Sequence, residues 1–208
     1  VIYSHARLTY TKVGEMLNTQ KPNLALREEY KDVVGDIDEL YALYKVLRAT
    51  REVRGAIDFE TTETRILFDD DRKIDKIVPV VRNDAHKLIE ECMLCANVSA
   101  AKFIEKHELD GLFRVHNGPK EQKLTNLKTF LGALGLSLPS RAPTPADYQQ
   151  LLEKIADRPD SKIIQTVMLR SLSQAMYQPD NQGHFGLAYD AYAHFTSPIR
   201  RYPDLLVH

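Results

Sequence analysis

Residues 191–204 read AYAHFTSPIRRYPD, and this stretch decides how the fold is interpreted. Ser197 is a favoured helix-capping residue, and Pro198 is favoured at the first helical position after a cap. A helix beginning there would place Arg200 and Arg201 in its first turn, beside free backbone N–H groups and the positive end of the helix dipole. Arginine also supplies a planar fork of donors for phosphate oxygens. The spacing therefore predicts a phosphate site at a helix start.

Two alternatives stay open for this stretch. An ordinary helix start with solvated arginines would show the same spacing. A helix that ran on from Pro198 would lose a hydrogen bond at Pro203, so the regular helix could instead begin at Pro203. The aromatic residues near the arginines, Tyr192, Phe195 and Tyr202, suit either base stacking or simple packing.

The composition indicates a globular chain without a membrane span. Hydrophobic residues make up 43% of the 208 residues, enough for a sizeable core. No apolar run is long enough to span a bilayer, and the N-terminus lacks the layout of a signal peptide. With 28 basic and 29 acidic residues the net charge is -1, so any nucleic-acid contact must come from a local patch. The first residue is not Met and the last lies in a predicted helix, so both ends are interpreted as cuts.

The apolar pattern predicts an α+β fold. Helices are expected over residues 26–54, 83–105, 121–134, 144–156 and 160–176, the first two being long and amphipathic. Strands are expected over residues 1–10, 56–60, 64–68, 74–80 and 111–115. We therefore expect long amphipathic helices packed on a mixed, largely antiparallel sheet.

Six blocks of the sequence resemble, in order, the catalytic domain of the RNB-type exoribonucleases (the ribonuclease II/R family), most closely its ribonuclease R branch. The blocks are SHARLTY (4–10), RGAIDF (54–59), RNDAHKLIEE (82–91), FRVH (113–116), GHFGL (183–187) and YAHFTSPIRRYPD (192–204). We call residues 183–204 the signature segment. The resemblance covers essentially the whole chain and implies that residues 1–208 are the C-terminal part of one RNB-type catalytic domain, cut at both ends.

This resemblance implies the activity of a longer parent protein. Such enzymes hydrolyse single-stranded RNA from its 3′ end and release nucleoside 5′-monophosphates, with Mg²⁺ or Mn²⁺ held by aspartates in a block resembling Asp-Phe-Asp-Asp. That block is expected upstream of residue 1, so we expect residues 1–208 to bind no metal and to be inactive alone. Residues 69–71 are three aspartates, but they suit a turn between two strands. The parent is expected to be cytoplasmic and monomeric, with flanking domains of the same polypeptide as partners and no membrane contact.

Three roles follow from the resemblance at matching positions. Arg200 matches the catalytic arginine that holds the scissile phosphate. Phe59 matches an aromatic residue that stacks on the terminal bases, the alternative being a core phenylalanine on a strand. Glu90 matches a carboxylate that could accept a hydrogen bond from a 2′-hydroxyl, the alternative being a solvated helix residue.

Further RNA contacts are predicted from residue type and position. Arg114 and His116 suit phosphate contacts, with surface solvation as an equal alternative. His194 is interpreted as a hydrogen-bonding partner near the RNA path. The remaining predicted RNA-binding residues all belong to the signature segment: Tyr192, Ser197, Arg201 and Tyr202.

Rival interpretations concern function and the two cysteines. The chain could belong to an RNA-binding or structural relative without hydrolysis, or it could be a helical interaction domain without nucleic-acid function.

Cys92 and Cys95 form a C-x-x-C pair in an apolar helical run without a second pair, so core cysteines are favoured over a zinc site. So few cysteines argue for a reducing compartment.

Overall fold

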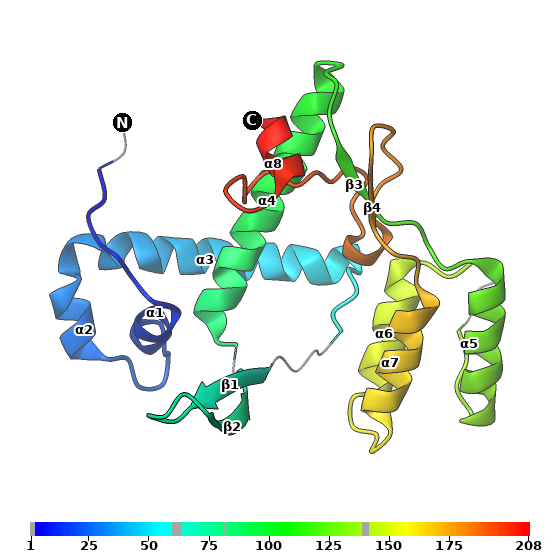
Figure 1. The fold of residues 1–208 in the computed structure, drawn as a ribbon, viewed down its shortest axis with the longest axis horizontal. Coiled ribbons are helices and arrows are strands. Elements are labelled where there is room, and N and C mark those ends of the chain that lie inside the picture. The colour runs from blue at the N-terminus through cyan, green and yellow to red at the C-terminus, as the bar shows by residue number, and fades with distance from the viewer. Residues whose placement is uncertain (1–2, 60–63, 81, 139–141) are drawn as a thin grey trace. The chain divides into compact units, whose positions relative to one another are not determined.

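The computed structural model describes residues 3–59, 64–80, 82–138 and 142–208 (Figure 1). The chain combines helices with two short antiparallel strand pairs, which confirms the α+β class. The elements are α1 (Tyr10–Met16), α2 (Leu24–Glu29), α3 (Lys31–Arg54), β1 (Thr64–Phe68), β2 (Ile74–Pro79), α4 (Asp84–Lys106), β3 (Phe113–Val115), α5 (Glu121–Ala133), α6 (Pro145–Ile155), α7 (Ser161–Ser171), β4 (Met176–Gln178), the 3-10 helix η1 (Phe185–Leu187) and α8 (Tyr202–Val207). None of these described helices is both long and apolar enough to cross a membrane.

Contacts divide the chain into two compact units. The first comprises residues 1–49 and 61–92, and the second comprises residues 50–60 and 93–208. Helices α3 and α4 each contribute residues to both units.

The first unit closes around an apolar cluster made by Met16, Leu17, Ile37, Tyr44 and Leu88. Its strands β1 and β2 form an antiparallel hairpin, as predicted. The turn of the hairpin contains the aspartates 69–71, where the backbone N–H of Lys73 donates to Oδ1 of Asp69 at 2.8 Å. The turn interpretation of these aspartates is therefore confirmed.

In the second unit, α5, α6 and α7 form a helical group (Figure 1). We call its apolar interior the α5–α7 cluster, and its most buried members are Leu127, Leu131, Tyr148, Ile155, Ile164 and Met168. Helix α6 begins with the expected cap, because Thr144 accepts from the backbone N–H of Asp147 and the Asp147 carboxylate accepts from the backbone N–H of Thr144.

A short ladder in the same unit places the signature segment beside β3. Strands β3 and β4 pair antiparallel, Phe113 also pairs with Ala193, and His116 forms a parallel bridge with His184. The backbone N–H of Arg114 donates to the Tyr192 carbonyl at 2.8 Å. The strands named above thus form two antiparallel pairs with one parallel bridge, in place of the single sheet expected.

Four secondary-structure predictions are wrong in the described residues. The single helix expected over residues 26–54 is divided at Tyr30, where α2 ends at Glu29 and α3 begins at Lys31. Residues 56–59 form no strand, because Ile57 N–H donates to the Gly186 carbonyl and Asp58 N–H donates to the Gln149 side chain. Residues 3–9 form no strand, since Thr9 already caps α1. Helix α7 ends at Ser171, five residues before the predicted end, and the unpredicted strand β4 begins at Met176. The rest of the two predicted strands, residues 1–2 and 60, lies outside the described residues.

Candidate nucleic-acid interface

The signature segment ends in a tight turn that carries both arginines. The backbone N–H groups of Arg200 and Arg201 both donate to the Ser197 carbonyl, at 3.2 and 3.0 Å. The regular helix α8 begins only at Tyr202, with Pro203 in its first turn. The alternative that starts the helix near Pro203 is thus confirmed, because a proline ring is accepted in a first turn but not inside a helix.

The helix start predicted at Ser197 and Pro198, on which the phosphate site was based, is consequently wrong. Ser197 does not cap α8, and its own backbone N–H donates to Oδ1 of Asp204 at 2.8 Å. The N–H groups of Arg200 and Arg201 are spent on the turn itself. A phosphate contact by Arg200 or Arg201 would therefore come from the side chain, since both backbone N–H groups are engaged.

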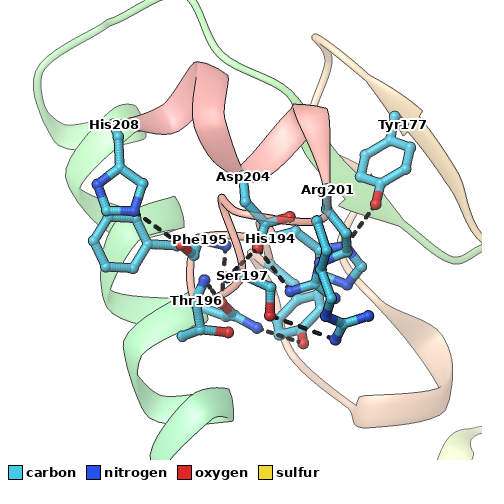
Figure 2. A network of polar contacts seen from close by, with 11 residues as sticks. Tyr177, His194, Phe195, Thr196, Ser197, Arg201, Asp204 and His208 are labelled. Carbon is cyan, nitrogen blue, oxygen red and sulfur yellow. Dashed lines mark hydrogen bonds and ion pairs between the residues drawn. The ribbon is translucent and has the colours of Figure 1, made fainter.

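Asp204 holds the turn together from inside. Its side chain is fully buried, with an exposed fraction of 0%, and its Oδ1 also accepts from Nη2 of Arg201 at 2.7 Å. Figure 2 shows Ser197, Arg201 and Asp204 pointing toward one another. Burial acts to raise the pKa of Asp204, but the Arg201 guanidinium and the Ser197 N–H outweigh it and hold the pKa below its ordinary value. Asp204 is therefore a buried, charged carboxylate that stabilises the turn through its hydrogen bonds to Ser197 and Arg201.

The two arginines have different surroundings. Arg201 is half-buried and paired with Asp204. Arg200 is exposed, and its guanidinium makes one side-chain hydrogen bond to a described residue, from Nη2 to Oγ of Ser197 at 3.4 Å. Its neighbour Ile199 is 98% exposed. Arg200 therefore has most of its donors available to a ligand.

The residues just before the turn, Phe195 and Thr196, are held by Asn97 on α4. The Oδ1 of Asn97 accepts from the backbone N–H groups of Phe195 at 3.0 Å and Thr196 at 3.2 Å. Its Nδ2 donates to the hydroxyl of Tyr192 at 2.9 Å. Only 2% of Asn97 and 6% of Tyr192 is exposed. Tyr192 is therefore packed inside the protein, the alternative to base stacking that the sequence had left open.

Tyr177 on β4 joins Arg114 and His194 in one group. The Arg114 guanidinium lies over the Tyr177 ring at 4.5 Å, and the Tyr177 hydroxyl lies 2.6 Å from Nδ1 of His194 (Figure 2). Burial, together with the charge of Arg201, lowers the pKa of His194 to about 4. The ring is therefore neutral near pH 7, and its Nδ1 shares a hydrogen bond with the Tyr177 hydroxyl. The charges of Arg201, Arg114 and Arg200 lower this pKa and that of Asp204 raises it, so arginines outnumber carboxylates among the charges that act on His194.

His116 has a supporting position. It is 9% exposed, with Nε2 at 2.9 Å from the Ser173 carbonyl and Nδ1 accepting from the Gly186 N–H at 3.0 Å. Both ring nitrogens are thus engaged within the protein. In this conformation His116 fixes the start of the signature segment and has no nitrogen left for a phosphate.

Phe59 and Glu90 occupy other places. Phe59 is half-buried in the second unit and packs against the α5–α7 cluster. Glu90 lies on α4 in the first unit, where its carboxylate pairs with the Arg82 guanidinium. Tyr202 is 70% exposed beside the turn, so its ring is open to stacking.

Sequence reasoning missed three residues of this site. Asn97 had a usable signal, since it is a polar residue in an apolar helical run and shares a face with the buried Leu94 and Ala101. Asp204 stood in the quoted stretch but received no role. Tyr177 had no local signal, because its place depends on the pairing of β4 with β3.

No metal centre is formed by the part of the chain that the structure describes. It contains no group of three or more histidine, cysteine, aspartate or glutamate side chains able to hold an ion. Cys92 and Cys95 form no disulfide. The described residues therefore do not fit a catalytic divalent metal by themselves.

Comparisons with known proteins agree with this geometry. The model of the RNB domain matches residues 1–208. Ribonuclease R of Vibrio cholerae is 56% identical over 209 residues, and that of Escherichia coli is 53% identical; each alignment covers 100% of this chain and 25% of the relative. RNase R of Mycoplasma genitalium, solved with ribose-methylated single-stranded RNA, has a TM-score of 0.84 at 30% identity, covering 96% of this chain and 31% of that one. The chain thus spans about a quarter of the length of its curated relatives. On this evidence, the chain belongs to the RNB domain family.

Proposed function

We propose that residues 1–208 are the RNA-gripping, C-terminal part of the RNB catalytic domain of a 3′-to-5′ exoribonuclease that acts on single-stranded RNA ends. The observation that carries the proposal is the exposed Arg200 on a turn fixed by buried groups, in a chain related to ribonuclease R over its whole length. The M. genitalium relative has been solved with single-stranded and with double-stranded RNA, which supports RNA as the substrate.

Arg200 is the catalytic residue of this proposal. Water attacks the phosphorus of the last phosphodiester, the bond from phosphorus to the upstream 3′-oxygen breaks, and a nucleoside 5′-monophosphate leaves. The guanidinium of Arg200 binds the phosphate oxygens through its planar fork and stabilises the charge that grows on them. Ser197 and Asp204 contribute by holding the turn.

The remaining contacts follow the RNA strand. Arg114, Arg201 and His194 provide a cationic, donor-bearing surface for phosphates, and Tyr202 offers an exposed ring for a base. Phe59 stacks on the terminal bases and Glu90 accepts from a ribose 2′-hydroxyl. Tyr192, Ser197 and His116 act from inside, by fixing the segment that carries these groups.

Metal chemistry belongs to residues outside this chain in our proposal. Mg²⁺ or Mn²⁺ would polarise the phosphate and supply activated water in the intact protein. Residues 1–208 alone are accordingly inactive. We further propose a monomeric protein in the cytoplasm, a reducing compartment that suits a chain with only two cysteines.

Degradation of end-labelled RNA tests the proposal. The intact protein carrying residues 1–208 is incubated with 3′-labelled single-stranded RNA and either metal, beside the same RNA with a 2′-deoxy 3′ end. We expect labelled mononucleotide as the first product, and slower release from the deoxy end. Salt-dependent RNA binding without any degradation would instead support the non-catalytic relative. An absence of RNA binding would contradict both.

A further inference from the structure

One buried amide joins α4 to the signature segment. Asn97 is 2% exposed, and its side chain makes three hydrogen bonds to residues 95 to 99 positions away. Leu94, Ala101 and Ile104, its neighbours on the same helical face, are all buried and apolar. A lone polar group on such a face is costly unless every hydrogen bond is made.

The chemistry of the site requires an amide. One oxygen must accept from two consecutive backbone N–H groups, those of Phe195 and Thr196, and a donor must face the Tyr192 hydroxyl. Asparagine provides an acceptor with two lone pairs and a donor on the same planar group. A leucine of similar size would leave two partly buried N–H groups and one buried hydroxyl without the partner that Asn97 provides.

These contacts fix one end of the turn that carries Arg200. Phe195 and Thr196 lead directly into Ser197, whose N–H is held by the buried Asp204. The turn is thus fixed at its start by Asn97 and closed from inside by Asp204, while Arg200 projects from it with few contacts of its own. Since the guanidinium is not held by its own neighbours, its direction depends on the backbone that Asn97 sets.

We propose that Asn97 is a positioning residue for Arg200. It does not touch RNA; it sets the backbone from which Arg200 reaches the scissile phosphate, so the inference rests on the proposed function. Small displacements of a catalytic group lower turnover steeply. RNA affinity depends on several other side chains, so losing Asn97 should lower kcat and leave KM nearly unchanged.

The test uses single and double variants of the intact protein. Asn97→Leu is expected to lower kcat by about 10- to 100-fold with KM changed less than about twofold. Combined with Arg200→Lys, it should add little further loss, because both changes remove the same phosphate contact. Tyr148→Phe is the matched control: it removes another buried hydrogen bond, to Ser171 at 3.0 Å, and should lower Tm without lowering kcat.

Asn97→Asp keeps the inference testable if the leucine variant does not fold. A carboxylate still accepts from both N–H groups, and the Tyr192 hydroxyl can turn to donate to it. We expect its kcat to stay within about tenfold of the wild type, above that of Asn97→Leu. A folded Asn97→Asp as slow as Arg200→Lys, or a double variant whose losses multiply, would overturn the role of Asn97. An Arg200→Lys variant with normal turnover would instead overturn the proposed function.

Discussion

The α5–α7 cluster and the signature segment lie in the same unit but are stabilised in different ways. The cluster is apolar, and its most buried side chains, among them Leu127, Leu131, Ile155, Ile164 and Met168, are exposed by at most 1%. The signature segment is fixed by a few directional contacts to Asn97, Asp204 and His116. Apolar packing is spread over many contacts and adds stability, whereas a hydrogen bond to a buried group also fixes a direction. The cluster should therefore determine stability, and the segment should determine the geometry of Arg200.

The largest expected effect comes from Arg200 itself. An ammonium lacks the two-pronged fork of a guanidinium, so Arg200→Lys in the intact protein should lower kcat by about 10²- to 10³-fold. Tm should stay unchanged, because the side chain is exposed. Single-turnover kinetics and RNA binding measured on the same preparation check this. Equal losses in affinity and turnover would assign Arg200 to RNA binding alone.

A substitution in the α5–α7 cluster should do the opposite: it should lower stability and leave turnover nearly unchanged. Leu131 is fully buried in the α5–α7 cluster, so Leu131→Ala should destabilise the protein by about 2–5 kcal/mol. Turnover measured well below the melting temperature should stay within about twofold of the wild type. Gln122→Ala, at an exposed position on α5 where the side chain bonds to Asn126 of the same helix, is the control for a change in this region that spares the cluster.

Phe59 connects the two regions, since it packs on the cluster and is proposed to stack on bases. Stacking contributes about 1–3 kcal/mol per base, so Phe59→Ala should weaken binding of short RNA ends by that amount and lengthen the final product. Gel analysis of the limit products, together with a melting curve, separates the alternatives. A lower Tm with an unaltered product would make Phe59 a core residue.

The smallest effect concerns pH. Burial, with His116 nearby, lowers the pKa of His184 from 6.5 to about 3, and burial lowers that of His194 to about 4. Between these values and 6.5 the unfolded chain binds more protons, so the free energy of unfolding should fall as pH is lowered through that window. Each histidine contributes a slope of at most about 1.4 kcal/mol per pH unit.

His184→Asn sharpens this prediction. The His184 ring accepts from the Leu187 N–H as a cap of η1, and an asparagine oxygen can do the same without titrating. Unfolding of the variant between pH 7 and pH 4.5 should show a shallower slope than the wild type. An identical slope would mean that His184 does not drive the pH dependence.

The sequence predicted what depends on local patterns and missed what depends on pairing. The Thr144 cap of α6, the α4 helix and the turn at Asp69 follow from neighbouring residues, and each was predicted. Strand β4 was missed, because three residues become a strand only by pairing with β3. The helix start was misplaced at Ser197 because nothing local shows that Asp204 takes its N–H. The function was inferred from the resemblance to a known family. The hydrogen bonds from Asn97 and Asp204 that hold the turn carrying Arg200 could be found only in the structure.

One side-by-side measurement tests the division of roles most directly. Asp204→Ala and Leu131→Ala are made in the intact protein, and kcat at saturating single-stranded RNA is measured well below both melting temperatures. Asp204→Ala removes the partner of Ser197 and Arg201 and should lower kcat by about tenfold or more, while Leu131→Ala should leave kcat within about twofold. Equal losses in the two variants, or a normal kcat for Asp204→Ala, would contradict the claim that polar bracing of the signature segment sets turnover.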